Sequence, residues 1–474
     1  MRTPPALPRH QHGALLILLV IALGILAATV FVGMLSSSDI QNQRDKTTAA
    51  ALAEAKAALI GFAVGVNLTT TANRRPGDLP CPDLNNDGIA ETSCGNAAGT
   101  TDQNLRIGRL PWKTLGLNDL RDGEGERLWY AVSNNFKNNT RTVCTSPGQL
   151  GCLNSDSKGT ITIRNSNGQI TYDGNGSTGA VAIVISPGAV LQRQGAANTQ
   201  DRSCTIGTNC DVAEKCTTSP ASLTPKCNPT NYLDIGNGED NADFVDSNSN
   251  GFINGLILVA NPLNPNNRIV IVNDRLLTIS ADEIIPLLAK RVGGEVMNCL
   301  SIYSTTNQNN QRYPWAAKLD ISVPPNYNYN DATDIRFGRI PDSPFSNTQT
   351  SSGNINTMDK VWPGACKITS NSGWWLNWKE MVFYGVADTY KPSTTNPPLS
   401  PPCPSCLRVN PPSTTADKHV VVIVAGKMLP GQSRTTNPNK GDAANYLEGG
   451  NESGIDMYTS GNTTPTFNDY LLYK

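Results

Sequence analysis

Residues 14–35 read ALLILLVIALGILAATVFVGML, a run of 22 residues without a charged side chain. As an α-helix with 1.5 Å of rise per residue, this run is ~33 Å long, enough to cross the hydrocarbon core of a bilayer. Polar SSSDIQNQRDK follows directly, whereas a cleaved secretory signal has a shorter apolar core and an exit site of small residues. The sequence therefore predicts a transmembrane helix at residues 14–35.

The helical pattern continues beyond this span. Residues 46–65, KTTAAALAEAKAALIGFAVG, are rich in Ala, Leu, Glu and Lys, which are good helix formers. No proline occurs between Ala14 and Asn67. We therefore predict one helix over residues 14–65, with residues 36–65 as an extension that projects from the membrane.

The charge balance argues against a nucleic-acid partner. The 474 residues carry 38 basic and 39 acidic side chains, a net charge of −1, and no run of Lys and Arg. Such a chain has no long-range field that would attract phosphates. Its length favours two or three domains.

The few histidines exclude most familiar hydrolase mechanisms. There are three, at His10, His12 and His419, so one histidine is left after the apolar run. A zinc site with several His ligands or a facial iron triad cannot be built from that supply, and the sequence has no G-x-S-x-G elbow. Carboxylate chemistry such as glycoside hydrolysis stays open, but the sequence nominates no carboxylate pair. We expect a noncatalytic protein.

Twelve cysteines, most in neighbouring pairs within polar sequence, are typical of disulfides formed in an oxidising compartment. Because short loops are easy to close, we predict local pairing, with one long closure left by elimination. The predicted bonds are Cys81–Cys94, Cys144–Cys152, Cys204–Cys210, Cys216–Cys227, Cys403–Cys406 and Cys299–Cys366. The cysteines must lie on the oxidising side, which places the N-terminus in the cytoplasm. The basic residues on the two sides of the span barely orient it.

The N-terminus also resembles a known family. The leader sequence RHQHG at residues 9–13, the uncharged run from Ala14 and the amphipathic extension resemble a class III prepilin over residues 1–65. The family comprises type IV pilins, minor pilins and type II secretion pseudopilins. The resemblance implies that prepilin peptidase cuts after Gly13, removing leader 1–13, and methylates Ala14. It also implies a bacterial inner-membrane protein that assembles with other pilin or pseudopilin subunits.

One residue departs from the pattern of the major subunits. Major pilins carry Glu at the fifth mature position, and this chain has Leu18 there. Certain minor subunits, notably the large tip pseudopilin, also lack this Glu. The resemblance therefore implies a minor subunit at the tip of a fibre or at its initiation.

The chain after the helix resembles itself. Five matches occur in the same order in two halves, beginning with LRIGRLP and IRFGRIP. The matched ranges are 105–111 with 335–341, 128–132 with 382–386, 180–185 with 420–425, 231–234 with 445–448, and 273–277 with 468–472. The ordered series predicts a duplicated exposed part, with a first module at residues 66–279 and a second at residues 280–474.

Each module reads as a helix followed by short strands and long polar loops. Ser280 and Glu283 form a capping box that opens the second helix, which Pro286 is expected to disturb. The pattern predicts an α+β fold of two tandem helix-plus-antiparallel-sheet modules, with loops held by disulfides. Pilin heads resemble this arrangement. Arg109 and Arg339, which recur at matching places, are expected to anchor loops.

Asp83, Asn85, Asp87 and Glu91 place oxygen ligands at loop positions 1, 3, 5 and 9, with Gly88 at position 6. Calcium prefers such ligands, although Cys94 replaces the bidentate Glu of an EF-hand. Residues 246–251 repeat the pattern with one carboxylate. The alternative is a polar turn, which Asp and Asn favour without a metal.

Trp374, Trp375 and Trp378 form the densest aromatic cluster, in NSGWWLNWKE at residues 371–380. Exposed Trp side chains commonly contact sugars or protein partners, and buried ones fill a core. Both alternatives stay open.

Three hypotheses follow. The first is a noncatalytic minor pilin or pseudopilin with an oversized periplasmic or extracellular head. The second is an adhesion protein that binds surface glycans and uses the same fibre as a stalk. The third is a membrane-anchored, carboxylate-based glycosidase.

Overall fold

A computed structural model describes most of the chain after residue 36. The described residues are 20, 23, 37–68, 74–97, 102–139, 141–145, 151–194, 199–244, 251–306, 309–319, 329–344, 349–350, 353–354, 358–366, 368, 373–395, 399, 403–412, 415–454 and 456–474. The predicted leader, Gly13, Ala14 and Leu18 lie outside the described residues, as does the predicted span apart from Val20 and Leu23.

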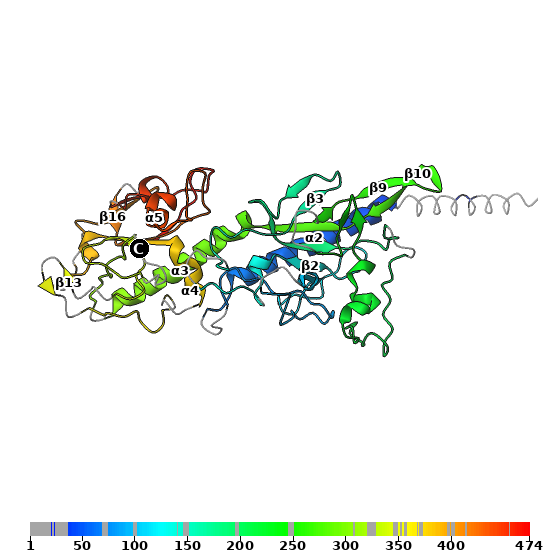
Figure 1. Ribbon diagram of the computed structural model, residues 1–474, viewed down its shortest axis with the longest axis horizontal. Coiled ribbons are helices and arrows are strands. Elements are labelled where there is room, and N and C mark those ends of the chain that lie inside the picture. The colour runs from blue at the N-terminus through cyan, green and yellow to red at the C-terminus, as the bar shows by residue number, and fades with distance from the viewer. Residues whose placement is uncertain are drawn as a thin grey trace, which may run out of the picture.

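The molecule is elongated, and its two halves lie end to end along the long axis (Figure 1). We call residues 37–280 the first half and residues 281–474 the second half. Each half contains one long helix, α2 (Ser37–Val64) in the first and α3 (Ala281–Thr305) in the second. Helix and sheet are therefore combined in each half, as the sequence predicts.

The first half is built on a four-stranded antiparallel sheet. Its strands are β1 (Ile107–Arg109), β2 (Trp129–Val132), β5 (Ala180–Ser186) and β11 (Arg275–Ser280), in the order β1-β2-β5-β11. Strand β5, AVAIVIS, is buried along its whole length because α2 covers one face. The buried residues of α2 begin at Thr48 and include Ala51, Leu52, Ala55, Leu59 and Ala63.

The same part of α2 is apolar enough to resemble a membrane span. Among the described residues, one helix, Asp39–Val64, is long and apolar enough to cross a membrane, with a mean hydropathy of 1.4. However, 33% of the apolar 18-residue window in this helix is buried within the protein, and the helix packs on β5 and β11. The buried part of α2 therefore belongs to the folded head.

The second half has a sheet of the same order and direction. Its strands are β12 (Phe337–Arg339), β15 (Val382–Val386), β18 (Val420–Val424) and β20 (Tyr470–Tyr473), all antiparallel. Helix α3 packs on β18 and β20, and at Gly293 it lies so close that a Cβ would meet Leu472 at 2.4 Å. The capping box of Ser280 and Glu283 forms as predicted, and α3 continues through Pro286.

Smaller sheets flank these two layers. In each half a three-stranded sheet has one antiparallel and one parallel pairing: β4-β3-β8 in the first half and β17-β16-β19 in the second. Their strands are β3 (Ile163–Asn165), β4 (Ile170–Tyr172), β8 (Phe252–Asn254), β16 (Leu407–Asn410), β17 (Ala416–Lys418) and β19 (Met457–Thr459). Three strand pairs complete the sheets: β6 (Ile235–Gly236) with β7 (Glu239–Asp240), β9 (Ile257–Asn261) with β10 (Asn264–Val272), and β13 (Gln349–Thr350) with β14 (Gly353–Asn354).

Short helices connect the strands. They are α4 (Gly373–Trp378), α5 (Asn437–Lys440), and the 3-10 helices η1 (Gln103–Arg106), η2 (Asn134–Phe136), η3 (Ala221–Leu223), η4 (Pro225–Cys227), η5 (Pro229–Asn231), η7 (Lys379–Met381), η8 (Asp388–Tyr390), η9 (Ala443–Asn445) and η10 (Gly449–Asn451).

Five of the predicted disulfides are present. They are Cys81–Cys94, Cys144–Cys152, Cys204–Cys210, Cys216–Cys227 and Cys403–Cys406. The bond Cys299–Cys366 stays a prediction, and both side chains are buried in the same hydrophobic cluster. That cluster contains residues of α2, α3 and both large sheets, so one core is continuous across the two halves.

Candidate functional site

The loop predicted to bind calcium is closed by its own backbone. The Asp83 carboxylate accepts hydrogen bonds from the amides of Asn85, Asp87 and Gly88, the last at 2.7 Å. Burial raises the pKa of Asp83 to about 6. Glu91 turns back to accept the amide of Leu84 at 3.3 Å. The loop is therefore ordered through Asx-type contacts, the alternative that its sequence left open.

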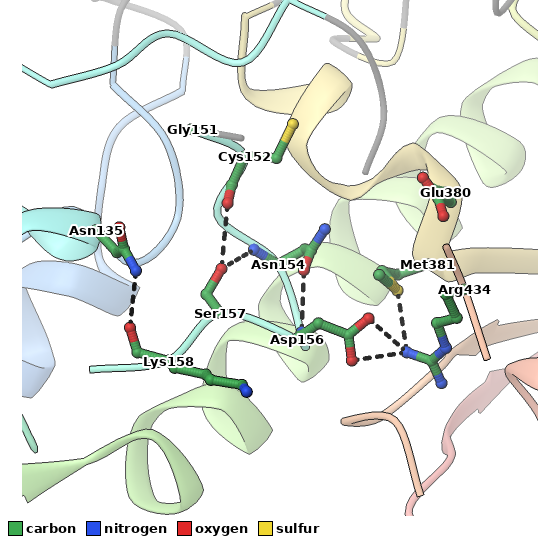
Figure 2. Close-up of a pocket in the computed structure, with 10 residues that line it drawn as sticks. All are labelled: Asn135, Gly151, Cys152, Asn154, Asp156, Ser157, Lys158, Glu380, Met381 and Arg434. Atoms are coloured by element: carbon green, nitrogen blue, oxygen red, sulfur yellow. Dashed lines mark hydrogen bonds and ion pairs between the residues drawn. The ribbon is translucent and has the colours of Figure 1, made fainter. Parts of the chain in front are cut away.

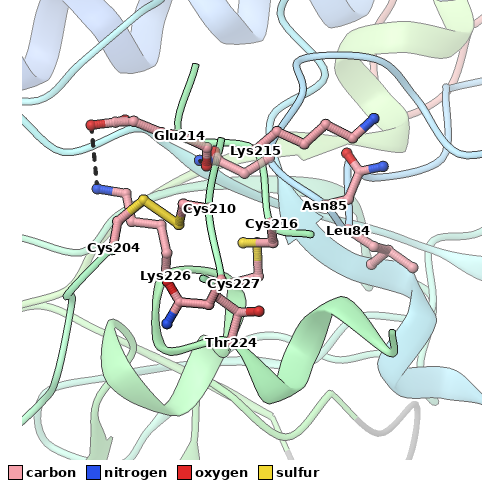
Figure 3. Close-up of a disulfide and its surroundings, with 12 residues drawn as sticks. Leu84, Asn85, Cys204, Cys210, Glu214, Lys215, Cys216, Thr224, Lys226 and Cys227 are labelled. Carbon is pink, nitrogen blue, oxygen red and sulfur yellow. Dashed lines mark hydrogen bonds and ion pairs between the residues drawn. A yellow bond between two sulfur atoms is a disulfide. The ribbon is translucent and has the colours of Figure 1, made fainter. Parts of the chain in front are cut away.

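A disulfide-bearing segment covers this loop (Figure 3). The amide of Cys216 donates to the carbonyl of Asn85 at 2.8 Å. Lys215 Nζ lies 2.9 Å from Asp87 Oδ2. Burial raises the pKa of Asp87, but the hydrogen bonds from Lys215 and from the amide of Ile89, together with the charge of Lys215, outweigh burial, so the pKa is lowered. An ammonium group thus contacts a carboxylate that the sequence assigns to calcium.

No group of three or more His, Cys, Asp or Glu side chains is arranged to hold a metal among the described residues. The second candidate loop, residues 246–251, lies outside them except for Gly251. Calcium binding at Asp83, Asn85, Asp87 and Glu91 stays a prediction, to which Lys215 is a competitor that local spacing did not reveal.

The three tryptophans are core residues, the second of the two alternatives that the sequence left open. Trp374, Trp375 and Trp378 on α4 are 3%, 0% and 0% exposed. They belong to the hydrophobic cluster that is continuous across the two halves. The large apolar area of the indoles is used at the junction between the halves, where a ligand cannot reach it.

Asn377, between these tryptophans, fastens the first half to α4. Its Oδ1 accepts the amide of Leu153 at 2.8 Å and the guanidinium of Arg75 at 3.2 Å. Arg75 is itself buried and paired with Asp78 at 2.8 Å. The amide side chain therefore satisfies two buried donors from the other half, which fixes the position of the two halves.

A cavity of about 270 Å³ lies beside this contact (Figure 2). It is lined by Asn135, Gly151, Cys152, Asn154, Asp156, Ser157 and Lys158 of the first half and by Glu380, Met381 and Arg434 of the second. Figure 2 shows Asp156 and Arg434 facing each other across the boundary between the halves.

Asp156 of the first half binds the segment that follows β18 in the second half. Its Oδ1 accepts the amide of Met428 at 2.8 Å, and both of its oxygens lie 3.0 Å from Arg434 Nη1. Ser155 Oγ also donates to the carbonyl of Ala425 at 2.6 Å. In the first half, the matching backbone at the end of β5 is bound by a carboxylate of the same half. Asp122 accepts hydrogen bonds there from Ser186 Oγ and from the amide of Gly188. The first half thus supplies a structural carboxylate to the second.

Arg434 has a counterpart in Arg202. Arg434 contacts the carbonyls of Gly426, Asn445 and Tyr446 and the side chain of Gln432. Arg202 contacts Gly188, Asn231, Tyr232 and Gln200 in the same way. The two arginines differ in their acidic partner, which is Glu126 for Arg202 and Asp156 for Arg434.

Arg109 and Arg339 also make matching contacts, and these contacts anchor loops. The guanidinium of Arg109 lies over the rings of Trp129 and Tyr232, at 4.2 and 3.9 Å from their centroids, and donates to the carbonyl of Lys226. The guanidinium of Arg339 lies over the rings of Phe383 and Tyr446, at 3.8 and 4.3 Å, and donates to the carbonyl of Lys440. Both guanidinium groups are buried.

The sequence did not reveal two buried acid pairs. In the first half, Asp274 Oδ2 accepts the backbone amide of Asp234 and the side-chain amide of Asn241, and Asp234 Oδ2 accepts the backbone amide of Asn273. Burial raises the pKa of Asp234 to about 6, and burial together with the neighbouring Asp234 raises the pKa of Asp274 well above its usual value.

The second half repeats this network. Asp469 Oδ2 accepts the amide of Glu448 and the side chain of Asn451, and Glu448 Oε2 accepts the amide of Asn468. Burial and the neighbouring Glu448 raise the pKa of Asp469 well above its usual value. The acids of both networks lie in the fourth and fifth repeated motifs of the sequence. Nothing in the sequence showed that these two motifs are in contact.

Comparison with known proteins gives no family for this chain. No protein-family model matches it, and neither the curated proteins nor the solved structures contain a significant match.

Proposed function

We propose that this chain is a noncatalytic minor pilin-like or pseudopilin-like subunit of a type IV pilus or type II secretion fibre. The observation that carries the proposal is the course of α2. The helix follows the apolar run 14–35, is exposed over its first turns, and from Thr48 onward packs on an antiparallel sheet. Such a helix connects a membrane segment to a folded head, and in lipid its association with other helices depends on packing.

The proposed position in the fibre is the tip or the initiating complex. After cleavage at Gly13, the new ammonium of Ala14 would need a carboxylate from a neighbouring helix, because an unpaired charge in lipid costs several kcal/mol. Leu18 cannot supply that carboxylate to a subunit stacked above it. A head of two halves would also crowd every repeat of a helical filament.

We further propose that the two halves are duplicated pilin-like modules. The matched sheet orders, the matching cation–π contacts of Arg109 and Arg339, and the two acid networks support this reading. The placement in the bacterial inner membrane, with a cytoplasmic N-terminus, is supported by the disulfides, which form on the oxidising side.

The glycan-binding alternative loses its main support, because it rested on tryptophans that are buried.

Quantitative proteomics of purified fibres tests the proposed position. We expect this subunit to be far less abundant than the main pilin. Leu18→Glu should increase its incorporation along the shaft, and Leu18→Ile is the matched control. Abundance near that of the main subunit, or gold label along the whole shaft of the wild type, would contradict the proposal.

A further inference from the structure

The hairpin of β9 and β10 has no counterpart in residues 460–469, the corresponding connection of the second half. In the first half, residues 255–274 connect β8 to β11, and the hairpin forms within them. The corresponding connection in the second half, from β19 to β20, is residues 460–469, and no strand is formed within it. The hairpin is therefore an addition to the shared architecture and does not belong to either core sheet.

The outer part of the hairpin is exposed and apolar at its tip. Residues 264–269 of β10 are all exposed, and Leu263 at the turn is 94% exposed. Leu256 and Ile269 are 56% and 38% exposed. A turn needs no large apolar side chain for its own geometry, so Leu263 is available to enter an apolar phase at this end of the molecule.

The hairpin tip lies at the end of the molecule where α2 begins. Figure 1 shows β9 and β10 projecting along the long axis beyond the first turns of α2. The apolar run 14–35 ends directly before α2. If that run crosses a bilayer, the membrane surface lies at this end, beside the tip.

The chemistry of the tip favours lipid over a strand of another protein. Pro262 and Pro265 flank Leu263 and have no amide to donate, which disfavours strand addition at this edge. Arg268 is the single charged residue in the range 256–273. The tip has no carboxylate that an anionic headgroup would repel, and its one charged side chain is the exposed Arg268.

We propose that this hairpin inserts Leu263 into the headgroup region of the membrane and so supports the first half at the bilayer surface. The inference rests on the proposed membrane span. It adds a second contact to the helix, one that restrains rotation of the head about the axis of α2.

Quenching by brominated lipids tests this contact in the full chain, reconstituted in nanodiscs of zwitterionic and anionic lipid. Leu263→Trp adds one indole at the tip, and the emission of the seven native Trp residues is subtracted with the wild type. Val361→Trp is the control, at a side chain of the second half that is 67% exposed. Val20→Trp reports on the proposed span.

We expect most of the added emission of Leu263→Trp and Val20→Trp to be lost, and that of Val361→Trp to be kept. Arg268→Glu in the Leu263→Trp background should weaken the quenching in anionic lipid. Quenching at Val20→Trp without quenching at Leu263→Trp overturns the hairpin contact and leaves the span intact; protection of the tip by a fibre subunit would then assign it to a protein. Absence of quenching at both sites refutes the span as well.

Discussion

Removing the Asp156 carboxylate should uncouple the two halves. Asp156→Ala deletes the bond to the amide of Met428 and the ion pair with Arg434, whose side chain is 4% exposed. A neutral hydrogen bond contributes about 1 kcal/mol and one to a charged group about 1.5–3 kcal/mol. Because the side chain of Asp156 is 30% exposed, water replaces part of the loss. We expect the free energy of unfolding to fall by about 2–3 kcal/mol.

Differential scanning calorimetry of the full chain measures this effect. The loss corresponds to a decrease of roughly 5–10 °C in the Tm of the second half, which should separate from the transition of the first half. Asp156→Asn keeps an acceptor for Met428 and should lose less. Lys158→Ala, at an exposed neighbour in the same cavity, is the matched control. A single, unshifted transition for Asp156→Ala would refute the idea that this carboxylate couples the halves.

Three further predictions concern other parts of the molecule. Because burial raises the pKa of Asp234 to about 6 and that of Asp274 well above its usual value, the folded state binds more protons than the unfolded state. The free energy of unfolding should therefore increase as the pH falls through about 6 towards about 4, and Asp274→Asn should flatten this dependence in urea titrations. Trp375→Ala should cost about 3–5 kcal/mol in the same assay, because it empties a fully buried site; a change below about 1 kcal/mol would contradict a core role. Calcium should raise the Tm of Lys215→Ala more than that of the wild type, since the ammonium no longer occupies Asp87; equal shifts would show that Lys215 does not compete.

The elements that the sequence predicted well are those set by local rules. The helix at residues 36–65 and the capping box at Ser280 follow from propensity and from fixed short spacings. Five disulfides join cysteines 3–13 residues apart, where loop closure alone favours the pairing.

What could not be predicted depends on contacts between distant segments. Lys215 and Asp87 are separated by 128 residues, so the spacing of a calcium loop cannot show that an ammonium covers it. The local sequence of α4 is the same whether its tryptophans face water or the protein interior. Their burial depends on the packing of the first half against the second, which the local sequence does not show. Asp156 and Arg434, 278 residues apart, meet because the two halves pack against each other.

Mass analysis of the mature N-terminus tests the central claim most directly. The proposed subunit should begin at Ala14, with a methylated amino group and without residues 1–13. Deletion of prepilin peptidase should restore the full leader. A mature protein that keeps Met1, or that is cut near Ser36, would contradict the assignment of this chain to a pilin-like fibre.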